Sequence, residues 1–260
     1  MENQYKIRSP FFYAIMRLMS NRAALVSGIL LSLIVLMAIF APLITKTSYE
    51  EQKFLMTSLA FPSQTHWFGV DDLGRDLFSR IVYGARVSLT IGFAAAICSV
   101  IIGLPLGALS GFYGGKVDWV IMRIIEVFSV VPPLIAALLL AALVDGGFFS
   151  IIFIAGIFGW VQVCLLVRAQ VMAFKEKEFI RSSLALGASP MYVIFVHLIP
   201  NSISPIIVGF VQAIPLAMML EAGLSFLGVG IQPPLPSWGQ MINIGTVSYT
   251  HLTLPTILLV

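Results

Sequence analysis

The side chains best suited to metal binding or nucleophilic chemistry are few in this 260-residue chain, and their spacing matches no common site pattern. The three histidines, His66, His197 and His251, are far apart, and neither His-Glu-x-x-His nor Cys-x-x-Cys occurs. Cys98 and Cys164 both fall within long apolar stretches, a placement that favours two packed thiols over a disulfide. The sequence therefore predicts no metal site.

A glycine-rich segment could in principle bind phosphate. Gly69 and Gly74 have the spacing of a P-loop, but Arg75 and Asp76 follow where that loop has Lys and then Ser or Thr. Because the lysine that reaches the phosphates and the hydroxyl that holds magnesium are both missing, we do not expect nucleotide binding here. We interpret the segment as a loop that leads into an interfacial helix, with Arg75, Asp76 and Ser79 pairing with or capping neighbouring groups.

Serines in the apolar stretches raise a second chemical hypothesis, an intramembrane protease. Such an enzyme needs a Ser–His pair, two aspartates or a metal motif at one depth. Ser99, Ser110 and Ser129 lie in these stretches, but no His and no Asp pair accompanies them. The sequence therefore predicts a chain that is not an enzyme.

The composition indicates which elements position these residues. The chain is 59% hydrophobic with a mean hydropathy of +0.99, and only 10% of its residues are charged, against about 25% in soluble domains. This composition disfavours an ordinary soluble enzyme, a disordered chain and a nucleic-acid-binding domain. Since a membrane helix needs about 20 apolar residues, we predict an all-α polytopic membrane protein with five transmembrane helices, near residues 23–44, 87–112, 119–144, 148–172 and 201–224.

The polar segments between these helices define the predicted organisation. Prolines fall inside several spans and are expected to bend them, namely Pro105, Pro132, Pro133 and Pro215. The successive parts are an N-terminal segment (1–22), a first transmembrane helix (23–45), an extracytoplasmic loop with an interfacial helix (46–86), a transmembrane core that includes a charged loop at 173–200 (87–245), and an atypical tail (246–260).

The distribution of basic residues predicts the orientation. Ten of the fifteen Lys and Arg residues fall on the side that holds the N-terminus, the turn at 113–118 and the loop at 173–200. The positive-inside rule places that side in the cytoplasm. The first apolar run is too long for a signal peptide and is interpreted as an uncleaved first span.

Polar side chains within the predicted spans are candidates for function or for pairing. Arg123 and Glu126 are three residues apart, which favours a local ion pair over a substrate contact. Glu221 either holds the loop that follows it or faces a transport pathway, and both interpretations stay open. Gln162 and Gln212 are candidates for the pore or for hydrogen bonds between helices, and the structural role is favoured.

The charged segment before the fifth span has the pattern of a helix, a turn and a second helix. Gly187 suits the end of the first helix, Ser189 is a candidate N-cap, and Pro190 fits a first helical turn. Two short helices beneath a membrane domain can insert into a groove on a soluble partner, or they can simply connect two spans.

This segment resembles the EAA loop of ABC importer permeases, whose pattern is Glu-Ala-Ala, three residues, Gly, nine residues and Ile-x-Leu-Pro. The matching positions are Arg181, Ser182 and Ser183 in place of Glu-Ala-Ala, then Gly187, and finally His197 and Pro200. The glycine and proline match at the right separation, while Arg181 replaces the acidic residue. The resemblance implies a coupling loop that docks on an ATPase subunit.

A second segment is similar to the signature of dipeptide, oligopeptide and nickel permeases, Gly-Thr-Asp-x-x-Gly-Arg-Asp, then Ser-Arg, then Gly-x-Arg-x-Ser-Leu. The matching residues are Gly69, Asp71, Gly74, Arg75, Asp76, Ser79, Arg80, Gly84 and Arg86. A third match runs over residues 221–230 and 236–239. Together the matches span about residues 17–243 and most resemble the C-type permease of these systems.

The resemblance implies a type I ABC importer permease fold and a set of partners. A second permease, two ATPase subunits and an extracytoplasmic binding protein would complete a bacterial or archaeal plasma-membrane importer for di- or oligopeptides, with nickel or another small solute as the alternative. ATP and magnesium would bind the ATPase subunits, and this chain would bind no cofactor. A secondary transporter is a further alternative, which the EAA-like loop disfavours.

The tail departs from the family. Such permeases continue into a sixth span, whereas residues 246–256 are rich in Ser and Thr and only 257–260 are uniformly apolar. That run is too short to cross a bilayer. We therefore expect a sixth span that is truncated, or a foreign junction near Gly245. The alternative is a five-span variant whose C-terminus lies outside.

Overall fold

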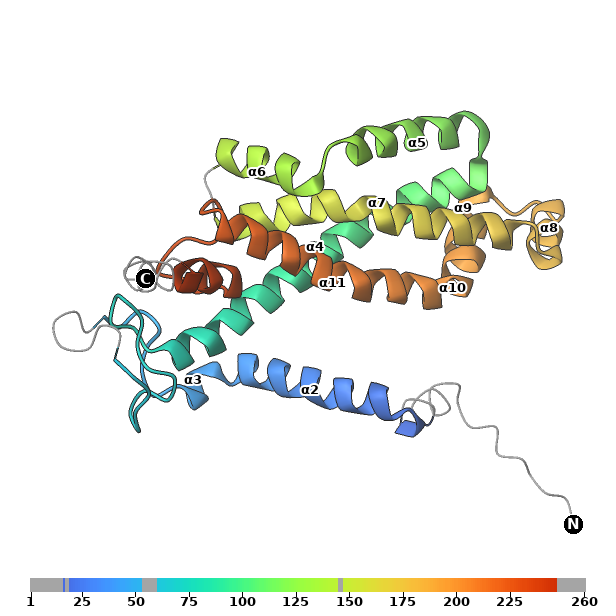
Figure 1. Cartoon of the computed structure of the whole chain (residues 1–260). Coiled ribbons are helices and arrows are strands. Elements are labelled where there is room, and N and C mark those ends of the chain that lie inside the picture. Colours follow the sequence, from blue (N-terminus) through green and yellow to red (C-terminus); the bar gives the residue numbers. More distant parts are fainter. Residues whose placement is uncertain (1–15, 17–18, 53–59, 145–146, 247–260) are drawn as a thin grey trace, which may run out of the picture.

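A computed structural model describes residues 16, 19–52, 60–144 and 147–246 (Figure 1). Within these ranges the chain is helical, and the one strand-like feature is an isolated antiparallel bridge between Val70 and Asp76. Beyond Thr246, the atypical tail and the expected sixth span lie outside the described residues. The helices with both ends among the described residues are α2 (Arg22–Ile39), α3 (Ala41–Ile44), α4 (Leu77–Tyr113), α5 (Gly115–Val130), α6 (Pro133–Leu143), α7 (Phe148–Lys175), α8 (Glu178–Ala185), α9 (Pro190–Tyr192), a π-helical turn (Val193–Leu198), α10 (Ile199–Asn201) and α11 (Ile203–Phe226). Residues 238–246 are helical as well.

Four helices of the described chain are long and apolar enough to cross a membrane by themselves, namely α2, α4, α7 and α11. A fifth span is formed only if α5 and α6 are counted together, and these two helices are bent by 85° relative to each other. Four of the five predicted spans are thus confirmed, and the remaining one corresponds to the bent pair α5–α6. The break follows from Pro132 and Pro133, because the residues before them, Val131 and Pro132, adopt extended backbone with ψ of 127° and 126°.

The second span is longer than the sequence predicted. Residues 77–86, predicted as an interfacial helix, are the first turns of the same helix, since α4 begins at Leu77 and runs for 37 residues. The Asp76 carboxylate caps its first turn by accepting from the Ser79 N–H at 2.8 Å, and no break separates residues 77–86 from the predicted span at 87–112. Pro105 and Pro215 lie inside α4 and α11 without terminating either helix. The first span is shorter than predicted, because α2 ends at Ile39 and Pro42 lies in the first turn of the separate α3.

Helices α4 and α7 form the most extensive contact of the bundle. Gly103, Gly107 and Gly111 lie on one face of α4, and a Cβ atom there would stand only 2.5–2.8 Å from backbone carbonyl oxygens of α7. The prediction from sequence does not include these glycines, although small residues four apart are a known signal for close packing of membrane helices. Cys164 is buried in this region, and both thiols are free as predicted.

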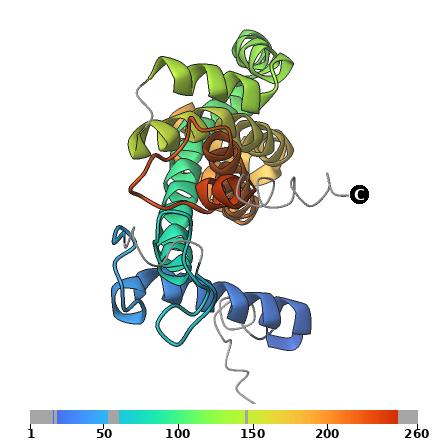
Figure 2. The same cartoon turned by 60° about the vertical axis from the view of Figure 1, so that its left-hand side comes forward.

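The two ends of the bundle carry different segments (Figure 1). The start of α2, the turn between α4 and α5, and the pair α8–α9 lie at one end, which we call the α8 end. The short α3 and residues 60–76 lie at the other, which we call the α3 end. In both views α2 lies on one side of α4 and α5–α6 lie on the opposite side (Figure 2).

Candidate functional site

The signature segment forms a compact loop at the α3 end, built around the carboxylate of Asp71. That carboxylate accepts hydrogen bonds from the backbone N–H of Leu73 at 3.0 Å and of Arg75 at 2.8 Å. It also accepts from the Arg75 Nε at 2.7 Å, and both side chains are buried. Because Asp71 occupies the N–H groups that an anion would need, the loop has no cradle for phosphate.

Two glycines and a second aspartate complete the loop. Gly69 and Gly74 have φ of +77° and +71°, a conformation that side-chain-bearing residues rarely adopt. At Gly69 an added Cβ would also meet the Ala60 carbonyl oxygen at 2.5 Å. Asp76 caps α4 and pairs with His66 Nδ1 at 3.0 Å. The predicted pairing and capping by Arg75 and Asp76 is confirmed.

Arg80 and Gly84 connect this loop to a distant part of the chain. The buried Arg80 donates from Nη2 to Gln240 Oε1 at 3.1 Å. Gly84 lies against the indole of Trp238, and a Cβ added to this glycine would stand 3.2 Å from the indole Cδ1. Ser79 is also buried, and its Oγ lies 3.1 Å from the Thr47 hydroxyl. The structure thus brings the signature residues together, except for Arg86, which is exposed on α4.

Glu221 is fully buried at the same end and holds the loop that follows α11. Its carboxylate accepts from Ser225 Oγ at 2.7 Å and from Ser88 Oγ at 3.3 Å. Ser225 Oγ in turn accepts from the Ile231 N–H at 3.0 Å, and Ser88 Oγ accepts from the Trp238 N–H at 3.3 Å. Of the two roles left open by the sequence, the geometry matches the first, since Glu221 does not line the cavity described below.

Replacing Glu221 with alanine is expected to destabilise the protein by about 2–3 kcal/mol, because two buried hydroxyls lose their acceptor. Thermal unfolding of the purified protein in detergent, followed by tryptophan fluorescence, measures this loss. The matched control is Glu221→Gln, whose amide oxygen still accepts from Ser225 and which is expected to lose clearly less. Equal losses in the two variants would contradict the proposed hydrogen-bonding role.

Two ion pairs involve residues of α5. Arg123 and Glu126 pair on the exposed face of α5, as the sequence predicts. Asp118 at the start of α5 forms a second pair with Arg168 of α7, through two hydrogen bonds of 2.5 and 2.7 Å. This pair was not predicted from sequence. The signal for this second pair is that Arg168 is the only cation within the fourth predicted span. A bidentate pair of this kind fixes the start of α5 to α7.

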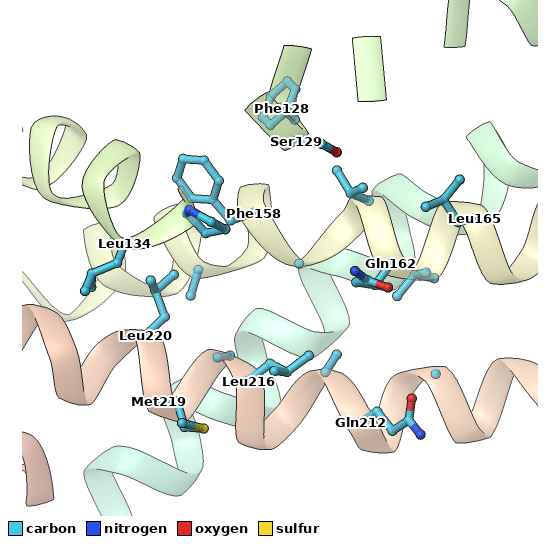
Figure 3. A pocket seen from close by; sticks show the side chains of 18 of the residues that line it. Phe128, Ser129, Leu134, Phe158, Gln162, Leu165, Gln212, Leu216, Met219 and Leu220 are labelled. Atoms are coloured by element: carbon cyan, nitrogen blue, oxygen red, sulfur yellow. The ribbon is translucent and has the colours of Figure 1, made fainter. Parts of the chain in front are cut away.

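A cavity of about 850 Å³ lies between α5–α6, α7 and α11 (Figure 3). Its lining residues are apolar or small except for Gln162 on α7, Gln212 on α11 and Ser129 on α5. Both glutamines are exposed, and neither side chain has a hydrogen-bond partner among the described residues. The favoured prediction, hydrogen bonds between helices, is therefore not observed, and the structure places both amides at the cavity wall.

The EAA-like loop has the predicted helix–turn–helix form at the α8 end. Gly187 has φ of +90° and donates its N–H to the Leu184 carbonyl at 3.0 Å, while the Ala188 N–H donates to the Ser183 carbonyl at 3.1 Å. These two bonds define a Schellman motif, which ends α8. Ser189 then caps α9 by accepting from the Tyr192 N–H at 3.3 Å.

One face of this loop anchors it and the other projects from the bundle. Ile180, Ile194 and Leu198 are buried in one cluster with Val171 of α7. Leu186 by contrast is 90% exposed. Apolar and aromatic side chains also project at other exposed positions of the loop, namely Phe179, Met191, Tyr192, Phe195 and Val196.

The matched EAA positions lie on or near this projecting surface. Arg181 and Ser182 are exposed, Ser183 is half-buried, and His197 stacks edge-on against Tyr192 with ring centroids 5.6 Å apart. Pro200 is exposed at the base of the loop. Arg181 also pairs with Glu176, which holds the pKa of that carboxyl below its ordinary value.

A helical membrane bundle with an uncharged cavity between its spans, and with two short helices projecting an apolar surface at one end, has the architecture of a transport permease. The comparisons with known proteins agree. Residues 103–260 match the family described as binding-protein-dependent transport system inner membrane component. Residues 9–62 match the N-terminal transmembrane domain of oligopeptide transport permease C. The chain belongs to this family of ABC importer permeases.

Individual relatives match over most of their length. The oligopeptide transport system permease protein OppC of Bacillus subtilis is 41% identical over 92% of this chain and 78% of its own. The dipeptide transport system permease protein DppC of Alkalihalophilus pseudofirmus is 39% identical over 93% and 79%. The glutathione transport system permease protein GsiD of Pectobacterium atrosepticum is 34% identical over 91% and 79%.

The fold is also found in a solved structure. A chain of the inward-facing MetNI methionine ABC transporter matches with a TM-score of 0.55 and 20% identity, covering 69% of this chain and 89% of that one. This likeness confirms the predicted type I importer permease fold.

Proposed function

We propose that this permease imports di- or oligopeptides as one half of a translocation path whose other half is a second permease. An extracytoplasmic binding protein delivers the peptide, and two ATPase subunits bind ATP and magnesium and drive the cycle. The observation that carries this proposal is that the relatives are named as oligopeptide, dipeptide and glutathione permeases. The two-helix loop at the α8 end also has the form expected of a loop that docks on an ATPase.

The α8 end lies in the cytoplasm in this proposal. The start of α2, the α4–α5 turn and the EAA-like loop lie at this end (Figure 1). Ten of the fifteen Lys and Arg residues fall on the same side of the predicted topology. The exposed apolar side chains around Leu186 then face the ATPase, which buries them on docking. Arg181, in place of the acidic residue of the EAA pattern, provides a cation at the edge of this contact.

Uptake by the reconstituted complex tests the proposed substrate. The four-component complex consists of this chain, the second permease and the two ATPase subunits. It is purified and placed in liposomes that contain ATP, and the binding protein is added outside. We expect ATP-dependent accumulation of labelled di-alanine or tetra-alanine that excess unlabelled peptide suppresses. Accumulation of Ni²⁺ or another small solute, with no uptake of either peptide, would overturn the peptide assignment and favour the alternative.

Replacement of Gly187 by valine tests the coupling loop. No side chain would clash there, because nothing lies within 4 Å of an added Cβ, but φ of +90° is strained for a β-branched residue. The strain of about 1–3 kcal/mol acts on the turn between α8 and α9, so we expect about tenfold lower uptake and weaker co-purification of the ATPase. Gly187→Asn, which tolerates positive φ better, is expected to lose less. Unchanged uptake and ATPase binding in Gly187→Val would refute the coupling role.

A further inference from the structure

The two cavity glutamines are unusual groups for a membrane interior. Gln162 lies near the middle of α7 and Gln212 near the middle of α11, so both are far from either end of their helices. A polar side chain at that depth is costly unless it pairs or faces water. Neither amide pairs with a described residue of this chain, and both line the cavity.

The rest of the cavity wall carries no charge. Its lining includes neither acidic nor basic residues and is dominated by side chains such as Phe158, Leu216 and Met219. Several ionic groups of the surrounding helices have partners away from the cavity lining. Asp118 and Arg168 bind each other, and Glu221 is enclosed by its serines.

A peptide that crosses a membrane brings backbone N–H and C=O groups that lose their water. An unpaired backbone group in an apolar environment is costly. A glutamine amide has both a donor and an acceptor, so it can pair with either group whatever the neighbouring side chain is. A charged residue in the cavity wall, by contrast, would attract peptides of opposite charge and repel peptides of like charge.

On these grounds, and resting on the proposed function, we propose that Gln162 and Gln212 pair with the backbone amides of a peptide in transit and so let this half of the path carry peptides of either side-chain charge. The occupant of the cavity is therefore the peptide chain. If the second permease filled the cavity instead, the two amides would be part of a subunit interface.

The test uses the complete four-component complex in ATP-containing liposomes. Gln162→Leu combined with Gln212→Leu is expected to lower uptake of tri-alanine about tenfold, since the peptide loses its amide partners. Gln170→Leu is the matched control, because it makes the same change on α7 at a position that does not line the cavity. It is expected to keep wild-type uptake.

The ratio of uptake of a basic peptide to that of an acidic peptide distinguishes pairing with the transported peptide from a structural role. Gln162→Glu is expected to raise the ratio of Ala-Lys-Ala to Ala-Glu-Ala uptake about fivefold over wild type. The binding protein is the same in all complexes, so its own preference cancels. A structural role would lower both peptides equally and leave the ratio unchanged.

Each remaining outcome decides against the inference. Wild-type uptake in the double leucine variant overturns it, as does an unchanged peptide ratio in Gln162→Glu. Loss of the second permease from the purified double variant also overturns it and identifies the cavity as a subunit contact. If the wild-type complex transports no peptide, the proposed function fails, and this inference fails with it.

Discussion

Replacing Gly107 with leucine is expected to prevent the protein from folding into its bundle. A Cβ at Gly107 would lie 2.5 Å from the Cys164 carbonyl oxygen, 2.9 Å from the Val167 Cβ and 3.1 Å from the Arg168 backbone nitrogen. Two of these three atoms belong to the backbone of α7, so no side-chain rotation can relieve the overlap. The helices must separate along their largest shared surface.

The size of the effect follows from the neighbouring glycines. Gly103 and Gly111 make equally close contacts one turn to either side, with carbonyl oxygens of α7 at 2.6 and 2.8 Å from an added Cβ. Separation of the helices at Gly107 therefore loosens all three glycine contacts together. The loss of folding stability is expected to exceed the roughly 3 kcal/mol of ordinary overpacking. We expect a yield of folded protein, measured by size-exclusion chromatography in detergent, at least about tenfold below wild type.

Gly28→Leu in α2 is the matched control for this change. No atom lies within 4 Å of an added Cβ at Gly28, and leucine is a better helix former than glycine. This variant is expected to fold with wild-type yield. The packing role of Gly107 is refuted if Gly107→Leu folds as well as Gly28→Leu and unfolds at the wild-type temperature.

The second large effect is expected for Asp71→Ala in the loop at the α3 end. The substitution removes the acceptor of the Arg75 guanidinium at 2.7 Å and leaves that buried cation unpaired. Arg80, buried with its Nε 3.7 Å from the same carboxylate, loses its nearest anion too. Removal of one partner of a buried ion pair costs about 3–5 kcal/mol. Thermal unfolding of the purified protein is the measurement.

Asp72→Ala is the natural comparison, since Asp72 is adjacent in sequence but exposed. That change is expected to alter stability by less than about 0.5 kcal/mol. Asp71→Asn separates the two functions of the carboxylate, because its amide oxygen can still accept from the turn N–H groups while the charge is lost. It is expected to fall between Asp71→Ala and wild type. If Asp71→Ala is as stable as Asp72→Ala, the loop does not depend on this ion pair.

Much of the helical layout and of the EAA-like loop could be predicted from sequence because the signals are local. Membrane helices follow from apolar stretches, and the end of α8 and start of α9 follow from Gly187 and Ser189, whose hydrogen bonds reach only three or four residues along the chain. The pairing of Arg123 with Glu126 and the capping by Asp76 are local as well. The errors at α4 and α2 concern where helices begin and end, where local signals are weakest.

By itself, the sequence determined that this is a helical membrane permease, where its chain turns, and which segments carry the family motifs. Only the tertiary structure decided that Glu221 holds a loop while Gln162 and Gln212 face a cavity. The physical reason is that α7 and α11 are apolar on all sides, so no periodic pattern distinguishes the face toward α4 from the face toward the cavity. The partners that make the distinction, such as Ser88 for Glu221, lie more than 130 residues away in the chain and meet it only through packing.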